Sequence, residues 1–168
     1  MSIFKVAGQY MSGQYKESAE TIWNLILGWK FFLEHEVVVG ITEETNAGRE
    51  NGFNNAGLLY MHENGVPSHN IPPRPVLQPA IAQPKVKEQI ETLMMDAARS
   101  ALVDGDVENA KACCEKAGMI GRDACKNYIL GGNLAPNSPK TIALKGSSTP
   151  LVDTGSLLQS ITYAVRKK

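Results

Sequence analysis

The sequence predicts an α+β fold in which a small antiparallel sheet packs against helices, with an α-helical hairpin and an extended proline-rich arm. Three observations predict this fold. Apolar residues recur at helical spacing in three long stretches of the chain. Two shorter stretches show the β-branched or alternating pattern of strands. Between these stretches, closely spaced prolines interrupt regular backbone hydrogen bonding.

Length and composition indicate one domain, residues 1–168, because 43% of the residues are hydrophobic and 20% are charged. The 17 Lys and Arg residues balance 17 Asp and Glu residues, so the chain has no overall basic field to hold a nucleic acid. Every apolar stretch is shorter than the roughly 20 residues that cross a bilayer. The N-terminus lacks a continuous apolar leader, so we expect a protein made in a reducing cytosol, with no membrane association.

The first predicted helix covers about residues 16–30. Its apolar residues, Ala19, Ile22, Trp23, Ile26 and Leu27, follow helical spacing and form one stripe, which we expect to pack into the body of the fold. Ser18 is its expected N-cap. Residues 35–41 have a β-branched centre and predict a strand, and the polar run at 42–48 predicts a loop. Residues 55–63 fit either a strand or a short helix.

The predicted arm covers about residues 64–84, where prolines favour a stiff, extended backbone. A helical hairpin follows at about residues 85–130. Its two helices are separated by the Asp104-Gly105-Asp106 turn, and the second ends at Gly131-Gly132. Gly118 and Gly121 are possible interruptions of the second helix.

The last part of the chain predicts a short helix, a loop and a final strand. Ser138 is the expected N-cap, Pro139 suits the first helical position, and residues 141–145 continue the turn. From Gln159 onward, Ser160, Thr162 and Ala164 alternate with Ile161, Tyr163 and Val165, which predicts a half-buried strand.

Two segments carry specific structural expectations. Arg74 is held between prolines, and its planar guanidinium suits a carboxylate such as Glu63 or one on a neighbouring subunit. In the second segment, Asp153 and Thr154 are expected to accept backbone N–H bonds at a helix start, while Gly155 forms the tight turn. The structural turn therefore comprises Leu151, Asp153, Thr154, Gly155 and Leu157, with the leucines supplying apolar contacts.

The sequence indicates no catalytic residue, no cofactor site and no metal site. Its three cysteines, Cys113, Cys114 and Cys125, are expected to be buried structural thiols, and its three histidines are scattered along the chain. The sequence lacks the motifs of zinc peptidases, nucleophile elbows, phosphate-binding loops and dinucleotide-binding sites. We therefore expect a protein that is not an enzyme; a thiol-dependent enzyme is the less favoured interpretation. Trp23 and Trp29 are expected to fill a core or an interface.

Residues 63–81 include Ile-Pro-Pro-Arg-Pro-Val-Leu-Gln-Pro at 71–79, and residues 137–163 include Pro-Leu-Val-Asp-Thr-Gly-Ser-Leu-Leu-Gln-Ser-Ile at 150–161. Together these two segments resemble the neck and tail-completion proteins of tailed bacteriophages. In that family an acidic residue precedes an arm of the form I-P-x-R-P-F-L-R-P, and a P-L-x-D-T-G-x-L-x-x-S-I segment leads into the last strand. Val76 occupies the position where the family usually has phenylalanine, and Gln78 occupies the position where it often has arginine. The resemblance spans roughly residues 35–165.

The resemblance implies a structural virion protein that forms a ring at the head–tail junction and lets DNA pass through its channel. It implies six identical copies, or twelve if the ring matches the portal side. Its partners would be head-completion or connector proteins and tail-terminator or tail-tube proteins, with DNA touched only non-specifically. The arm and both termini would reach neighbours, and the expected interface residues are Glu63, Ile71, Pro73, Arg74, Pro75, Leu77 and Pro79. The alternative is a non-virion assembly factor that binds structural subunits transiently.

Overall fold

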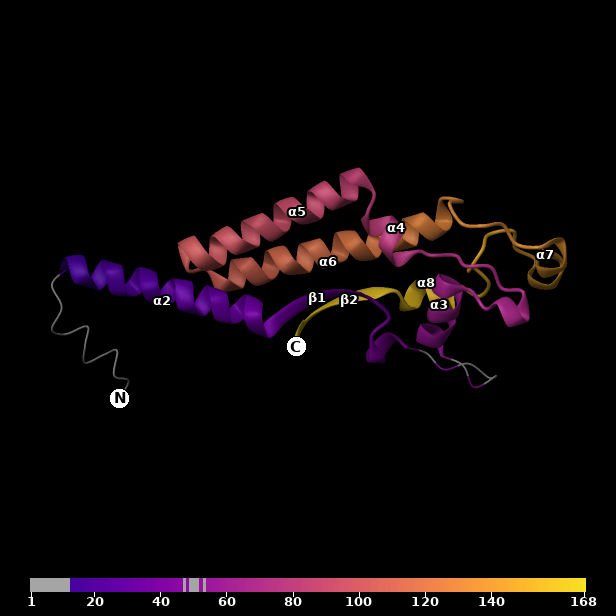
Figure 1. Cartoon of the computed structure of the whole chain (residues 1–168), viewed down its shortest axis with the longest axis horizontal. Helices are drawn as coiled ribbons and strands as arrows, with labels where there is room; N and C mark the ends of the chain where they lie inside the picture. The colour runs from indigo at the N-terminus through magenta and orange to yellow at the C-terminus, as the bar shows by residue number, and fades with distance from the viewer. Residues whose placement is uncertain (1–12, 47, 49–51, 53) are drawn as a thin grey trace.

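The computed structural model describes residues 13–46, 48, 52 and 54–168, with side chains described from residue 18. It is an α+β fold with a two-stranded antiparallel sheet packed against helices (Figure 1). The N-terminal residues 1–12, which were expected to reach a neighbour, lie outside the described residues. None of the helices in the described part of the chain combines the length and the hydropathy needed to cross a bilayer.

The sheet pairs a strand from the first third of the chain with the last strand. Strand β1, His35–Gly40, runs antiparallel to β2, Thr162–Lys167, and the register places Val37 opposite Val165 and Val39 opposite Tyr163. After β2, the backbone N–H of Lys168 donates to the carbonyl of Glu34. The C-terminus, which was expected to reach neighbours, is therefore bonded to its own chain. The predicted strand began too early, because residues 156–160 are helical.

The helical hairpin is confirmed. Helix α5, Pro84–Arg99, continues through the π-helical turn η3, Ser100–Asp104, and α6, Val107–Leu130, returns beside it (Figure 1). Gly105 adopts the left-handed conformation, with φ of 70°, and the Asp106 side chain accepts from the N–H of Asn109. Glycines 118 and 121 do not interrupt α6.

Shorter elements complete the chain. They are the 3₁₀ turns η1, Glu43–Thr45, and η2, Pro67–His69, and the helices α3, Asn55–Asn64, α4, Leu77–Ile81, α7, Pro139–Lys145, and α8, Ser156–Ser160. Residues 55–64 are thus a helix, the second of the two expected alternatives. Helix α7 has the expected cap, since the hydroxyl of Ser138 accepts from the N–H of Thr141 at 3.2 Å.

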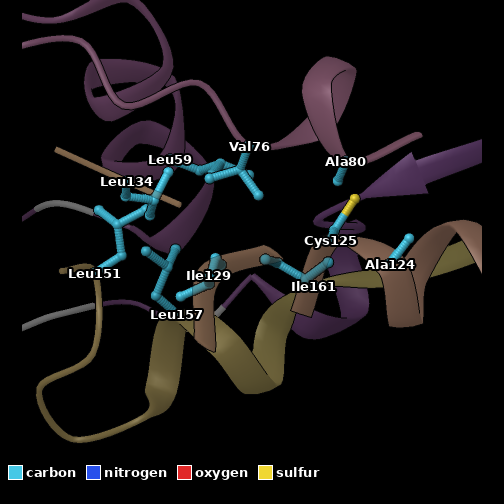
Figure 2. Close-up of a cluster of buried hydrophobic side chains, with 10 residues drawn as sticks. All are labelled: Leu59, Val76, Ala80, Ala124, Cys125, Ile129, Leu134, Leu151, Leu157 and Ile161. Carbon is cyan, nitrogen blue, oxygen red and sulfur yellow. The ribbon is translucent and has the colours of Figure 1, made fainter. Parts of the chain in front are cut away.

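Two buried clusters form the core, and α6 contributes to both. The first cluster joins α6 to α3, the arm and the residues before β2, and Figure 2 shows the Cys125 sulfur beside Ala80 in it. Its members are Leu59, Val76, Ala80, Ala124, Cys125, Ile129, Leu134, Leu151, Leu157 and Ile161. The second cluster lies near the hairpin turn and consists of Phe31, Ala97, Ala101, Ala110, Cys113 and Cys114. All three thiols are buried, as expected.

Helix α2, Gly13–Glu34, is longer than predicted and extends from the sheet to one end of the molecule (Figure 1). It contacts η3 through a narrow face. Gly28 is buried so closely against this turn that a Cβ there would lie 2.5 Å from the carbonyl oxygen of Ala101. Asn24 lies against Gly105, and Phe31 enters the second cluster. The apolar stripe that was expected to pack into the body lies mainly on other faces of α2, where Ile22 is 58% exposed.

Candidate functional site: the arm, the turn and an exposed helix face

The carboxylate of Glu63, near the end of α3, binds the backbone of the arm just before α4. Its Oε1 atom accepts from the backbone N–H groups of Val76 at 2.8 Å and Leu77 at 2.9 Å. These two donors lie at the start of α4, where the N–H groups have no helical partner. Glu63 therefore caps the arm within its own subunit.

Arg74 does not pair with Glu63, contrary to the sequence-based expectation. Its Nε atom donates to the carbonyl of Ala135 at 2.8 Å, and its Nη2 atom donates to the carbonyl of Pro136 at 3.0 Å. The side chain is only 8% exposed. The guanidinium uses its fork on two consecutive backbone carbonyls, because the loop after α6 presents them side by side. This contact joins the arm to residues about sixty positions further along the chain.

The arm alternates between buried and exposed residues. Arg74 and Val76 face inward and Val76 is completely buried, whereas Pro73 and Pro75 are exposed. The prolines do keep residues 72–76 out of helix and strand, as expected. The arm nevertheless lies on the body and contributes to its core, and the expected extended backbone is interrupted because residues 77–81 form helix α4. The remaining expected interface residues, Ile71, Leu77 and Pro79, are half-buried. An interface role stays a prediction for all seven residues: Glu63, Ile71, Pro73, Arg74, Pro75, Leu77 and Pro79.

The turn before the last strand has only part of the expected form, because α8 begins after Gly155 without a side-chain cap and no hydrogen bond to Asp153 is found among the described residues. Thr154 accepts from the N–H of Ser156 at 3.4 Å, and Gly155 has a φ of 82°, which favours glycine. Leu151 and Leu157 are buried in the first cluster, and Leu151 itself has a φ of 60°. Asp153 is exposed. The segment is therefore a tight turn at Gly155 that leads into α8.

A buried polar contact joins α3 to α8. The sequence did not predict it. Asn55 is completely buried, and its amide nitrogen donates to the hydroxyls of Ser160 at 2.6 Å and Ser156 at 2.9 Å. The hydroxyl of Thr45 donates to the Ser160 carbonyl at 2.8 Å. The only sequence signal is the spacing of Ser156 and Ser160, four residues apart on one face of a short helix.

The arm and the turn meet around a pocket of about 780 Å³. Its lining includes Ile71, Pro72 and Arg74 from the arm and Leu151, Asp153 and Thr154 from the turn, together with His62 and Lys145. Burial lowers the pKa of His62, and the positive charges of Arg74 and Lys145 lower it further. The Nδ1 atom of His62 is buried and has no hydrogen-bond partner among the described residues. Two segments that lie far apart in the sequence thus form one surface.

The described residues contain no group of three or more His, Cys, Asp or Glu side chains that could hold a metal ion. The cysteines are poorly suited to nucleophilic chemistry. Burial raises the pKa of Cys125 to about 11, and the charge of Glu63 contributes to this rise. Burial also raises the pKa of Cys114. Because the thiolate is the reactive form, these two thiols are held in the unreactive state.

A second surface is apolar and lies on α2. Seven large apolar side chains of this helix are between 37% and 68% exposed: Ile22, Trp23, Leu25, Ile26, Leu27, Trp29 and Leu33. Ile22, Ile26, Trp29 and Leu33 follow the i, i+4, i+7, i+11 spacing of a coiled-coil seam. This seam lies opposite the face through which Gly28 contacts η3. The sequence identified the apolar residues, but it placed them against the body.

Compared with known protein families, curated proteins and solved structures, the chain shows no match.

Proposed function

We propose that this chain is a structural subunit of the neck of a tailed-phage virion, where identical copies close into a ring between head and tail. The exposed apolar face of α2 is the observation that carries the proposal. The resemblance of residues 71–79 and 150–161 to neck and tail-completion proteins supplies the place of that ring in the virion. DNA passes through the channel without base-specific contacts.

The size of the apolar face favours a protein partner. If each of the seven exposed side chains presents about 100 Å², the face covers on the order of 700 Å², about one partner's share of a standard interface. The largest apolar patch on a typical monomer is about 300–600 Å². A helix that exposes this much apolar surface is stabilised when another molecule covers it.

The charges on α2 do not favour a lipid surface as that partner. Helices that lie on anionic membranes carry many Lys and Arg residues on their polar face. Helix α2 instead has two basic residues, Lys16 and Lys30, and three acidic ones, Glu17, Glu20 and Glu34. A polar face with this balance is not attracted to anionic lipid.

A ring follows from a heterologous contact, in which one surface of a subunit binds a different surface of the next and the rotation closes. We expect six copies, or twelve if the ring matches the portal side. Head-completion or connector proteins would lie on one side and tail-terminator or tail-tube proteins on the other.

Native mass spectrometry of the purified full-length chain tests self-assembly. We expect a species of six or twelve times the 18.2 kDa subunit mass. Replacing Ile22→Ser and Ile26→Ser should convert this species to monomer and leave the midpoint of urea unfolding of the monomer nearly unchanged, because both side chains are at least half exposed. The matched control, Leu144→Ser on α7, alters a side chain that is 80% exposed and should leave the assembly intact.

Quantitative mass spectrometry of purified virions tests the location. A structural subunit is present in a fixed number of copies per particle. A chain that is missing from mature virions but bound to head or tail subunits in infected cells would instead support the transient assembly factor. A wild-type chain that stays monomeric at high concentration, and is missing from virions, would contradict the proposal.

A further inference from the structure

We propose that the α2 helices of neighbouring copies pack side by side into a collar in which each α2 contacts the α2 of two neighbours. This inference rests on the proposed ring and identifies the surfaces that form it. The occupant of the exposed α2 face is thus a second copy of this chain on each side.

The width of the apolar face is the first argument. Successive residues of an α-helix are turned by about 100° from one another. Leu25, Ile26 and Leu27 follow one another in the sequence and are 38%, 50% and 37% exposed, so exposed apolar side chains extend over about 200° of the helix with Ile26 at the centre. The ion-paired Lys30 and Glu34 lie between Ile26 and Leu27, so the Leu27 flank is mixed in polarity and the Leu25 flank is apolar. A two-helix coiled coil covers only a narrow a/d stripe.

A symmetrical pair of α2 helices would therefore leave part of the face in water. The seam formed by Ile22, Ile26, Trp29 and Leu33 would be covered in such a pair, but Leu25 and Leu27 would lie on its two open flanks. Two neighbours, one on each flank, cover both residues. Each subunit of a closed ring has two neighbours, so the shape of the face agrees with a ring better than with a dimer.

The way in which α2 is attached to the body leaves the face open. The helix contacts η3 through its smallest residue, Gly28, and lies against Gly105 through Asn24, four residues before Gly28. These contacts lie on the side of the helix opposite Ile26, since residues 24 and 28 are each two positions from residue 26. The body thus supports α2 from behind and presents the apolar face outward.

Cysteine linking of the full chain tests the collar. The Leu25→Cys, Leu27→Cys double variant places one thiol on each flank, about 3 Å apart along the helix axis. A bifunctional maleimide should then join the thiol at position 25 of one copy to the thiol at position 27 of the next, which produces a ladder of covalent species up to the ring size on a denaturing gel. Either single variant should remain almost entirely monomeric on that gel, because the contact joins two different flanks.

Two control proteins measure how much linking occurs without the proposed contact. The wild-type chain should give no linked species, because Cys113, Cys114 and Cys125 are all buried. The Lys87→Cys, Gln89→Cys variant has the same two-residue spacing at exposed positions of α5, away from the proposed contact, and should also stay unlinked.

The possible outcomes separate this inference from the proposed function. A native ring whose Leu25→Cys, Leu27→Cys variant forms no ladder would overturn the collar and leave the ring proposal standing. An Ile26→Cys variant that links into dimers, together with a double variant that stops at dimers, would show a symmetrical pair and overturn the collar. A wild-type chain that stays monomeric by native mass at high concentration, and is missing from virions, would overturn both.

Discussion

At the scale of single residues, the arm is held to the body by side chains that bond to the backbone. Glu63 receives two N–H groups at the start of α4, and Arg74 donates to two carbonyls after α6. Each interaction satisfies backbone groups that have no helix or sheet partner, and each involves a charged side chain, which makes the hydrogen bonds stronger. The arm is therefore an ordered part of the subunit.

The Arg74→Lys variant measures how much the Arg74 side chain contributes to the stability of the fold. Lysine keeps the positive charge but has no planar fork, so we expect it to lose one of the two bonds and to lower the free energy of unfolding by about 2 kcal/mol. Urea unfolding followed by circular dichroism measures this change. The control is Arg99→Lys, at an exposed position near the end of α5, which should change the free energy by less than about 0.5 kcal/mol. Equal effects of the two substitutions would contradict the assigned role of the fork.

At the scale of elements, α6 lies on the sheet because two of its glycines allow close approach. A Cβ at Gly118 would lie 2.5 Å from Cδ2 of Tyr163, and one at Gly121 would lie 2.9 Å from Cγ2 of Val39. The two glycines are close to one helical turn apart and face different strands. They looked like helix interruptions in the sequence, whereas in the fold they are the contact surface of the helix.

We predict that Gly118→Ala destabilises the protein by about 1–3 kcal/mol, although alanine is the better helix former, because the added methyl group would overlap the ring of Tyr163. The Tyr163→Ala variant removes the ring, including the Cδ2 and Cγ atoms nearest to position 118, and tests the cause. In this background Gly118→Ala should destabilise the protein much less. Urea unfolding of the four proteins of this cycle measures the coupling, and purely additive effects would show that the ring is not what excludes the methyl group.

At the scale of the whole molecule, α6 links the two core clusters. Its Cys113 and Cys114 belong to the second cluster and its Cys125 to the first. The two strands are also joined by an ion pair, since Nε of Arg166 in β2 lies 2.9 Å from Oε1 of Glu36 in β1. The exposed setting of this ion pair limits its contribution to stability.

Because one continuous helix supplies both clusters, we predict that they unfold together. Pulsed alkylation across a urea series, read by mass spectrometry of the cysteine-containing peptides, should give the same midpoint for Cys125 as for Cys113 and Cys114. In the absence of urea at pH 8, little labelling is expected, since burial raises the pKa of Cys125 to about 11. Two separate midpoints would show that the halves of the subunit are independent units.

Local physical chemistry made most of the elements predictable from the sequence alone. Periodicity, capping and positive φ are determined by neighbouring residues. They account for the hairpin with its Asp-Gly-Asp turn, the Ser138 cap, the strand at residue 35 and the glycine of the turn at residue 155. The burial of the three cysteines followed from their positions on a helix with an apolar face.

Only the tertiary structure decided which surfaces meet. Arg74 bonds to the carbonyls of residues 135 and 136 because the fold brings that distant loop beside the arm. Helix α2 packs through Gly28 and leaves its apolar stripe outside, because close backbone approach at η3 selects the narrow face of the helix. Periodicity shows which residues of a helix share a face, but the contacts that bury one face and expose another are made with residues far away in the sequence.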